Sequence, residues 1–398
     1  MNGREILDAV VVGAGVVGTS AALALADEGL RVALVEARAP QPWARERPDL
    51  RVYAFAPDNA ALLARLGVWD AVAGARVQPY AHMCVWDAAG GGALRFDAAA
   101  LGRGELGWIV ENGLLVDRLW ARLQQAGVRV LCPERVAAIA QDADGATLAL
   151  ESGPRLRARL VVAADGAGST LRGLLGVPVE RHDYRQKGVV GFVRTEAPHA
   201  RTAWQRFLPS GPIAFLPFQD AAGDPHVCSI VWTLPDAEAD RIVALDDGAF
   251  GDAVTRAFGA CLGAVVPVSA RAAFPLQRQL AARYVVERTV LCGDAAHVVH
   301  PLAGQGVNLG LRDVAALRTS VAESLARGNP PGTPRRLAAW QRARRSDATL
   351  AAWSFDLINR GFSNDLLLPT LLRGPALGLA GRVPGLAGAL ARHAAGRG

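Results

Sequence analysis

A short apolar run followed by a glycine-rich loop and a helical pattern constrains this chain more than any other feature. Residues 289–291 are apolar, and the run CGDAAHVVHPLAGQGVNLG follows at 292–310. A helix that starts after such glycines offers free N–H groups and a partial positive charge to an electron-rich ligand. Asp294, at the end of the predicted strand, could accept hydrogen bonds from ligand hydroxyls. Considered without the rest of the chain, this pattern fits an ordinary strand–loop–helix connection as well.

A second strand–glycine–helix pattern lies near the N-terminus. Residues 8–12 predict a buried strand and residues 31–36 the next one, with an Ala- and Leu-rich helix between them. The glycines permit a tight turn and close approach of a pyrophosphate, and an acid about 20 residues further on can accept from the adenosine ribose. Because a carboxylate would repel a ribose 2′-phosphate, the pattern argues against bound NADP, but it leaves FAD and NAD open. The residues that form this pattern are Gly13, Gly15, Gly18 and Glu36.

The uncharged run at 9–26 could also suggest a membrane span or a signal peptide. Glu5 and Asp8 precede it, which is unlike the basic start of a secretory signal. Three glycines at fingerprint spacing have a better explanation in nucleotide binding. We therefore expect neither a signal peptide nor a transmembrane segment.

A third pattern of this kind occupies 160–172 and reads LVVAADGAGSTLR. It predicts a strand, a tight turn after Asp165, and a helix with Ser169 as its N-cap. A purely structural turn between strand and helix would look the same.

The order of the three patterns resembles the single-component flavin-dependent aromatic hydroxylases, which share the para-hydroxybenzoate hydroxylase fold, over nearly the whole chain. The segment GDAAHVVHPLAGQGVNLGLRDV at 293–314 resembles the ubiquinone-biosynthesis hydroxylases in particular. Four other stretches are more similar to the ring C5 and C6 hydroxylases than to the C1 enzyme. They are VEN at 110–112, WQRFLPSGPIAFLP at 204–217, SIVW at 229–232 and GFSN at 361–364.

The resemblance implies roles for individual residues. It implies catalytic roles for Arg51, His297 and Pro301, with Pro301 near the flavin edge. Asp294 would hold the ribitol chain, and the backbone of 304–308 would stabilise negative charge on the flavin. Family members commonly have a short residue where Phe55 stands, which predicts a local difference in flavin packing. The residues implied in FAD binding are Gly13, Gly15, Gly18, Glu36, Arg51, Asn112, Arg118, Asp165, Asp294, Pro301, Gly304, Gly306, Val307 and Asn308.

The resemblance also implies a reaction. The chain has one dinucleotide fingerprint, so NAD(P)H would bind briefly, reduce FAD and leave. The reduced flavin and O₂ would form a C4a-hydroperoxyflavin that hydroxylates the ring of a polyprenylated phenol, with C5 as the expected position. The protein would supply positioning, a dry pocket and charge stabilisation, while the cofactor carries the chemistry. The alternatives are C6 or C1 hydroxylation, an unrelated phenol, a flavin reductase or oxidase, or a low-turnover flavoprotein scaffold that helps hold a biosynthetic complex together.

Composition limits the remaining classes of function. The 398 residues include 51% apolar ones, enough for a large core and two lobes. The net charge of +6 comes from dispersed arginines, and no zinc pattern or basic–aromatic repeat accompanies it, so we expect no nucleic-acid partner. Five cysteines without C-x-x-C pairs fit a reducing cytosol. No third ligand accompanies His297 and His300, so no metal site is expected, and Cys292 is expected to be a buried strand residue.

These patterns together predict an α/β fold with an α+β second domain. A Rossmann-like FAD-binding domain would comprise 1–75, 106–182 and 276–330. A mainly β-sheet substrate domain would be inserted as 76–105 and 183–275, and a C-terminal helical region would cover 331–398. Aromatic residues of the inserted sheet could line an apolar channel, although core packing would use them equally well; they are Phe192, Trp204, Phe207, Phe215, Phe218 and Trp232.

The segment after Asp365 contains no acidic residue and alternates Leu and Ala with Gly, Pro and a few Arg. Such a segment can lie on a membrane surface, or it can pack on the protein or on a partner such as another ubiquinone-biosynthesis protein. The cysteine pattern predicts a cytoplasmic location. The C-terminal segment adds peripheral contact at the inner membrane as an alternative.

Overall fold

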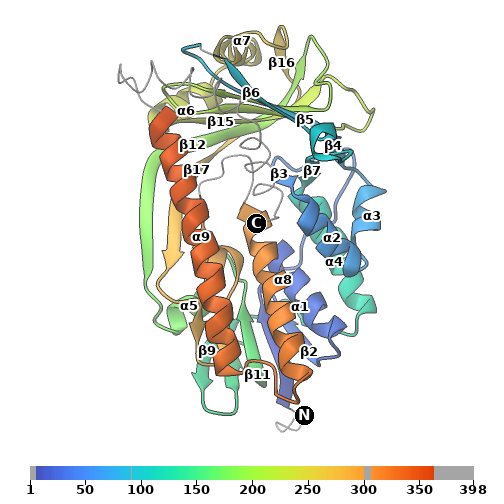
Figure 1. The fold of residues 1–398 in the computed structure, drawn as a ribbon, viewed down its shortest axis with the longest axis vertical. Coiled ribbons are helices and arrows are strands. Elements are labelled where there is room, and N and C mark those ends of the chain that lie inside the picture. The colour runs from blue at the N-terminus through green and yellow to red at the C-terminus, as the bar shows by residue number, and fades with distance from the viewer. Residues whose placement is uncertain (1–5, 91, 300–305, 363–398) are drawn as a thin grey trace.

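The computed structural model describes residues 6–90, 92–299 and 306–362, and it describes side chains up to residue 350. Three β-sheets and the helices packed against them form the molecule (Figure 1). Pro301, Gly304 and the segment from 363 onward lie outside the described residues.

The first sheet has a parallel centre. Strand β1 (Ile6–Val12) pairs in parallel with β2 (Val32–Val35) and β11 (Arg155–Ala163), and β11 pairs in parallel with β19 (Thr289–Leu291). The centre is apolar on both faces, as expected for parallel strands covered by other layers. The flanking strands are β8 (Arg129–Leu131), β9 (Val136–Gln141), β10 (Ala146–Leu150) and β18 (Val285–Val286).

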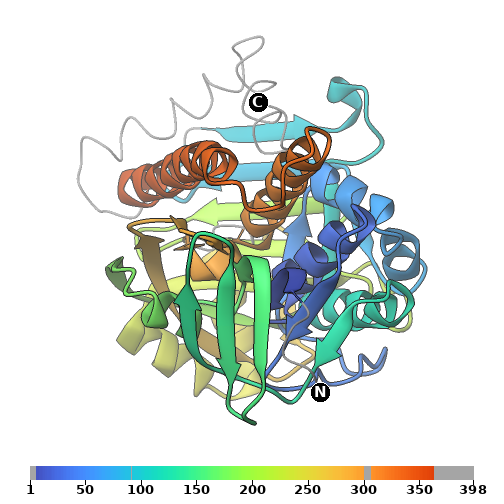
Figure 2. The ribbon, with the colours of Figure 1, turned by 90° about the horizontal axis from the view of Figure 1, so that it is seen from below.

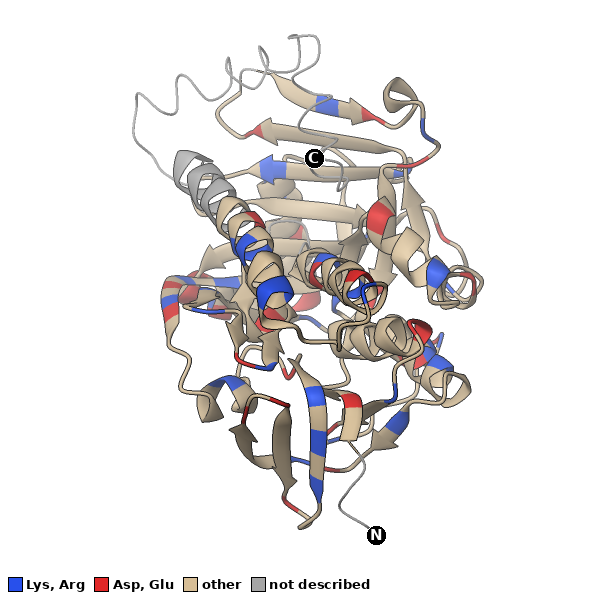
Figure 3. Cartoon of the chain, turned by 60° about the horizontal axis from the view of Figure 1, so that its bottom comes forward, with Lys and Arg blue, Asp and Glu red and all other residues tan. Residues whose placement is uncertain are grey.

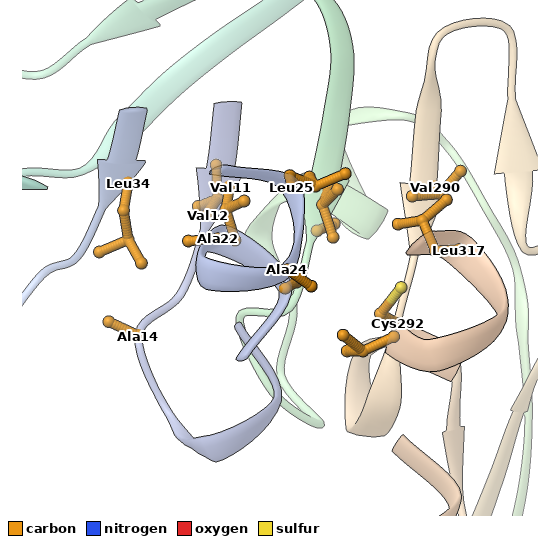
Figure 4. Packing of buried hydrophobic residues seen from close by; sticks show 14 of the residues in the cluster. Val11, Val12, Ala14, Ala22, Ala24, Leu25, Leu34, Val290, Cys292 and Leu317 are labelled. Atoms are coloured by element: carbon orange, nitrogen blue, oxygen red, sulfur yellow. The ribbon is translucent and has the colours of Figure 1, made fainter. Parts of the chain in front are cut away.

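Helices α1 (Val16–Asp27), α4 (Asn112–Gln125), α8 (Gly306–Leu325) and α9 (Pro334–Phe362) cover this sheet, with α8 and α9 side by side (Figure 2). Val11 and Val12 of β1 pack with Ala22 of α1 in the core (Figure 4). The contact between α1 and α8 depends on glycine, because a Cβ on Gly310 would lie 2.6 Å from Val17.

The second sheet is mainly antiparallel and lies across the top of the molecule in Figure 1. Its outer face carries α6 (Asp236–Val243) and α7 (Asp247–Phe258), which share a core with its central strands. The strand order is β20-β17-β12-β15-β14-β13-β5-β6, and β16 pairs with β12. The bounds are β20 His297–Val298, β17 Ala272–Ala281, β12 Val179–Thr195, β15 Val227–Pro235, β14 Ile213–Pro217, β13 Thr202–Phe207, β5 His82–Asp87, β6 Ala93–Asp97 and β16 Val265–Pro267.

A third, small sheet joins the two lobes. It contains β3 (Val52–Phe55), β7 (Gly107–Glu111) and β4 (Gln78–Tyr80). Val52 and Ile109 of this sheet form one apolar cluster with residues of the second sheet. The remaining short elements are α2 Pro57–Arg65, α3 Trp69–Ala73, α5 Thr170–Leu174, and the 3-10 turns η1 Ala99–Leu101 and η2 Gly293–Ala295.

The architecture confirms the predicted α/β fold class. Ser169 is the N-cap of α5, as predicted, and its side chain accepts a hydrogen bond from the Arg172 N–H. The boundaries proposed for the domains stay a prediction. Of the six aromatic residues named above for an apolar channel, five are buried and Trp204 is half-buried, so they serve mainly as core.

The uncharged run at 9–26 forms most of β1 and the buried helix α1, so its hydrophobicity serves the core. No helix within the described ranges is long and apolar enough to cross a membrane. Those same ranges contain no cluster of metal-ligating side chains. Cys292 is 1% exposed, in agreement with its predicted structural role. Basic and acidic residues are interspersed along the elements (Figure 3).

Candidate active site

The turn between β1 and α1 requires two of its glycines for steric reasons. A Cβ on Gly13 would lie 2.3 Å from the Ala164 carbonyl oxygen, and one on Gly18 would lie 1.9 Å from that of Gly13. Gly15 differs, because a Cβ there would meet no atom within 4 Å. Gly15 is the N-cap of α1 and supplies no capping side chain. The start of α1 therefore offers open space beside free N–H groups, the setting that a pyrophosphate requires.

Glu36 lies immediately after β2, next to this turn. One of its carboxylate oxygens accepts a hydrogen bond from Ala14 N at 2.6 Å, and the other accepts from Arg38 N at 3.0 Å. Trp120 of α4 holds the same turn from the other side, since its Nε1 donates to the Ala14 carbonyl at 2.9 Å. The carboxylate is thus fixed where the ribose of a bound dinucleotide would lie.

Asn112 and Arg118, both predicted near the cofactor, lie on α4. Asn112 accepts a hydrogen bond from the Tyr53 hydroxyl at 3.0 Å. The guanidinium of Arg118 lies over the Trp43 ring, 5.5 Å from its centroid, and pairs with Asp117. Asn112 Nδ2 also donates to the Asp49 carboxylate at 3.3 Å, so both residues lie beside the segment that joins Glu36 to Arg51.

Asp49 fixes the end of that segment, and the sequence patterns did not single it out. Its carboxylate accepts hydrogen bonds from Arg51 N at 2.9 Å and from Gly113 N at 3.1 Å. Its own N–H donates to Glu111 at 2.8 Å. The backbone position of Arg51, at the end of the loop, is therefore fixed by contacts of Asp49 with α4 and β7.

Asp294 lies near Arg51 and Tyr53, although it is far from both in the chain. The Asp294 side chain remains accessible, yet surrounding protein atoms are close enough that burial raises its pKa, while nearby His297 and Arg51 lower it. Burial likewise raises the pKa of the Tyr53 hydroxyl. No hydrogen bond to the Asp294 carboxylate occurs within the described parts of the chain. An accessible carboxylate with no donor among the described residues can accept hydrogen bonds from the hydroxyls of a ligand.

The N-terminus of α8 is tied to the β3–α2 segment by Asn308. Its Oδ1 accepts from Ala56 N at 3.0 Å and from Asn59 Nδ2 at 2.8 Å, and its Nδ2 donates to the Ala54 carbonyl at 2.7 Å. The side chain is therefore fully used within the protein. What remains for a ligand is the backbone of the first turn, which begins at Gly306 and Val307.

Two predicted site residues have structural partners instead. The Asp165 carboxylate accepts hydrogen bonds from Ser169 Oγ and Leu171 N, so its position favours stabilisation of the turn. His297 is 2% exposed, and its Nε2 lies 2.6 Å from Asp313. This burial argues against direct contact between His297 and a substrate.

Phe55, where the resemblance predicted a local difference in flavin packing, lies in the core. It is fully buried and stacks on Trp69, with ring centroids 5.6 Å apart. The bulky side chain thus fills the core beneath α3. The neighbouring Tyr53 and Ala54 are half-buried.

These residues fit FAD. The ends of β1, β2 and β19 lie at the same edge of a parallel sheet, where α/β proteins bind nucleotides. Gly15 with the α1 terminus suits the pyrophosphate, Glu36 suits the ribose, Asp294 suits the ribitol hydroxyls, and the start of α8 suits the electron-rich edge of the flavin.

Comparison with known proteins agrees with this site. A family model described as FAD binding domain matches residues 7–351. The chain is 37% identical to a ubiquinone hydroxylase of Rhodospirillum rubrum, over 98% of this chain and 90% of the relative. It is 36% identical to the 3-demethoxyubiquinol 3-hydroxylase of Escherichia coli K12, over 96% of each chain.

Solved structures show the same fold. The crystal structure of p-nitrophenol 4-monooxygenase from Pseudomonas putida superposes with a TM-score of 0.78, at 20% identity and over 99% of both chains. FAD is the cofactor of this family, and NAD(P)H and O₂ are its usual co-substrates. The chain belongs to the FAD-dependent ubiquinone-biosynthesis hydroxylases, and it is an FAD-dependent aromatic-ring monooxygenase.

Proposed function

We propose that this enzyme hydroxylates the ring of a polyprenylated phenol in ubiquinone biosynthesis, at ring position C5. The observation that carries the proposal is an apolar sheet face that borders the cluster containing Val52, the chain neighbour of Arg51. We define this face as Val190, Val231, Ala272 and Phe274, and it belongs to the second sheet.

Strand register shows which way the face points. Val190 pairs with both Val231 and Ala272, and two residues further along β12 is Phe192. Because side chains alternate along a strand, Phe192 shares the side of Val190. Phe192 packs in a cluster with Val52, the neighbour of Arg51. The apolar sheet face therefore extends from the predicted flavin site.

This face keeps part of its apolar surface in contact with solvent. Phe274 is 44% exposed, and the other three residues are half-buried. A ligand with a long hydrocarbon chain would remove this area from water, at about 25 cal/mol per Å². A small polar phenol would not need such a face.

The chain's own residues supply binding and positioning. Bound FAD would supply the electron transfer and the oxygen activation. Arg51 places a positive charge beside Asp294 and Tyr53, where it can stabilise anionic groups of cofactor or substrate. The apolar sheet face would exclude water from the reacting ring. We assign Pro301 and Gly304 to the flavin edge on the basis of the sequence motif alone.

Complementation tests the proposal. The gene is expressed in bacterial strains that each lack one ubiquinone-ring hydroxylase, and quinones are measured by mass spectrometry. Rescue of the C5 strain alone is the expected result. Rescue of no strain by a yellow, folded protein would place the substrate outside this pathway.

Similarity to a 3-demethoxyubiquinol 3-hydroxylase favours a second candidate, in which the enzyme hydroxylates a demethoxyubiquinol ring. The same assay separates the two candidates, because the strain that is rescued identifies the ring position. Accumulated demethoxyubiquinone that disappears on expression would support the second candidate.

We also propose peripheral contact with the inner membrane through the segment after Asp365, because that segment combines Leu and Ala with Arg and has no acidic residue. Sedimentation with anionic vesicles tests this contact. A variant with the arginines after residue 365 changed to Gln should sediment less. Equal sedimentation of both proteins would contradict the contact.

A further inference from the structure

Asp313 of α8 is the centre of a buried polar network. The residue is fully buried, and its carboxylate accepts hydrogen bonds from three directions. Oδ2 accepts from Gly293 N at 3.0 Å and lies 2.6 Å from His297 Nε2, and Oδ1 accepts from Arg344 Nε at 2.7 Å. Trp340 Nε1 adds a fourth contact by donating to the Asp313 carbonyl at 3.2 Å. Every partner is fixed by the fold, so the network has few alternative arrangements.

The partners of Asp313 belong to parts of the molecule that build the FAD site. Gly293 immediately precedes Asp294, and His297 starts β20 only three residues later. His297 pairs with Leu280 of β17 and thereby reaches the second sheet. Arg344 belongs to α9, which otherwise contributes no predicted site residue.

A second contact from α9 reaches the same region. The Oε1 atom of Gln341 accepts hydrogen bonds from Tyr284 N at 2.8 Å and from Val285 N at 2.9 Å. The ring of Tyr284 lies beside His297, with centroids 5.7 Å apart. Two residues of α9, Arg344 and Gln341, are therefore linked to the segment around Asp294. Arg344 is linked through Asp313, and Gln341 is linked through Tyr284.

Tight packing means that a shift of this segment would reach the pyrophosphate turn. Gly293 has a left-handed φ of 58°, and a Cβ on it would lie 3.1 Å from Val17 of α1. A Cβ on Gly310 of α8 would lie 3.1 Å from the Gly293 Cα. Helix α1, the Gly293-Asp294 segment and α8 thus meet without free space, and packed interiors transmit displacement.

We infer that Arg344 is a positioning residue for the FAD site, acting through Asp313 to hold the Gly293-Asp294 segment and His297 in place. The inference rests on FAD binding at the site described above. Arg344 neutralises a buried carboxylate that would otherwise be left with one negative charge and fewer donors. Without it, Asp313 would gain stability by turning toward water or by taking a proton, and either change weakens its hold on the Gly293 N–H.

The position of the Gly293-Asp294 segment would then depend on how α9 packs against α8. Arg344 itself acts on that segment only through Asp313. This gives His297 a role that fits its burial, since it would orient the segment and need not meet substrate. It also assigns a function to Asp313, which lies in the last part of the long sequence motif.

The test compares FAD affinity in Arg344→Gln and wild type, using flavin fluorescence during titration of the FAD-free protein. The expected result is a rise in the dissociation constant of about 10- to 100-fold, the range found when groups that hold metal ligands in place are removed. Arg344→Lys keeps the charge but loses the fork of donors, so an intermediate rise is expected. The visible spectrum of bound flavin should shift in the same order.

Two controls separate positioning from general destabilisation. Arg336→Gln removes an exposed ion pair between α9 and Glu323 of α8 and should leave FAD affinity unchanged. Val254→Ala creates a cavity in the core of the second sheet and should lower the melting temperature without a matching loss of FAD affinity.

Wild-type affinity in the folded Arg344 variants would overturn the inference and leave the FAD site intact. The same loss in Val254→Ala as in Arg344→Gln would also overturn it, because general destabilisation would explain both. If Arg344→Gln does not fold, Arg344→Lys decides, and an unchanged affinity and flavin spectrum in that variant contradict the inference. A wild-type protein that binds no FAD would overturn the proposed function itself.

Discussion

Arg76 and Glu111 form a buried ion pair, with Nη2 2.7 Å from Oε2 and side chains that are 2% and 1% exposed. The guanidinium of Arg76 also lies between two aromatic rings, 5.2 Å from the centroids of both Trp43 and Phe218. Trp43 belongs to the loop that leads to Arg51, whereas Phe218 follows β14 of the second sheet. A single cation thus joins the loop, the small sheet and the second sheet.

Arg76→Met should therefore lower the free energy of unfolding by about 3 kcal/mol, because it leaves the Glu111 charge buried without its partner. Two remaining donors to Glu111, Asp49 N and Trp43 Nε1, keep the loss at the lower end of the usual range. Urea titration measures the change. Arg241→Gln, which removes an exposed pair on α6, is the control and should show no measurable change. An equal effect of both variants would contradict this account of Arg76.

Gly15→Ala should separate folding from cofactor binding. A Cβ at residue 15 meets no protein atom, and the φ of −70° suits alanine, so stability should fall by about 1 kcal/mol or less. The methyl group would occupy the space where the pyrophosphate approaches, so FAD affinity should fall strongly. Gly13→Ala should instead unfold the protein or destabilise it severely, since its Cβ would overlap the Ala164 carbonyl. Normal FAD binding by Gly15→Ala would contradict the pyrophosphate site.

Asp294→Ala should weaken FAD retention, because the acceptor for the ribitol hydroxyls is lost. Purified variant protein as yellow as wild type would show that the placement of Asp294 is wrong. Asp294→Asn keeps the shape of the side chain and removes its negative charge. In the FAD-free protein it therefore tests the effect of that charge on stability.

The sign of the pH effect follows from the raised pKa of Asp294. The folded state holds the proton more tightly than the unfolded state, so stability falls as pH rises from the unfolded pKa through the folded one. FAD-free Asp294→Asn should thus melt higher than wild type at neutral pH and converge with it in acid. A variant that melts lower at neutral pH would contradict this reasoning.

His199 should make stability depend on pH in the opposite direction. Burial and the neighbouring His226 lower the pKa of His199 to about 4, although Asp224 raises it. Its Nδ1 accepts a hydrogen bond from Arg201 N at 3.1 Å, which a protonated ring could not do. Because only the unfolded chain takes up the proton, stability should fall by up to about 3 kcal/mol between pH 6.5 and pH 4. Thermal melts of wild type and His199→Asn at several pH values measure this, and identical slopes for both would exclude His199 as the cause.

Local patterns in the sequence were sufficient for much of the fold. Glycine spacing and apolar strands predicted the β1–α1–β2 unit, since only glycine can occupy Gly13 and Gly18 without steric overlap. Helix α5 begins at Thr170 with Ser169 as its N-cap, as the pattern at 160–172 predicted.

Long-range partners could not be predicted in this way. Asp49 lies in no motif, and Glu111 was visible only as part of the VEN stretch; the importance of both comes from the donors that the fold brings to them. Asp313 was visible within the family motif, but its contact with Arg344 depends on how α9 packs on α8. The catalytic prediction for His297 also depended on tertiary structure, because burial decides what an imidazole can touch.

The sequence by itself determined the dinucleotide turn, the α/β class and the family, because these depend on short-range sterics and on the periodicity of apolar residues. Only the tertiary structure decided which charged groups are buried together and which predicted site residues face a ligand. The physical reason is that desolvation and pairing depend on neighbours distant in the chain, as Asp294 beside Arg51 and Asp313 between His297 and Arg344 show.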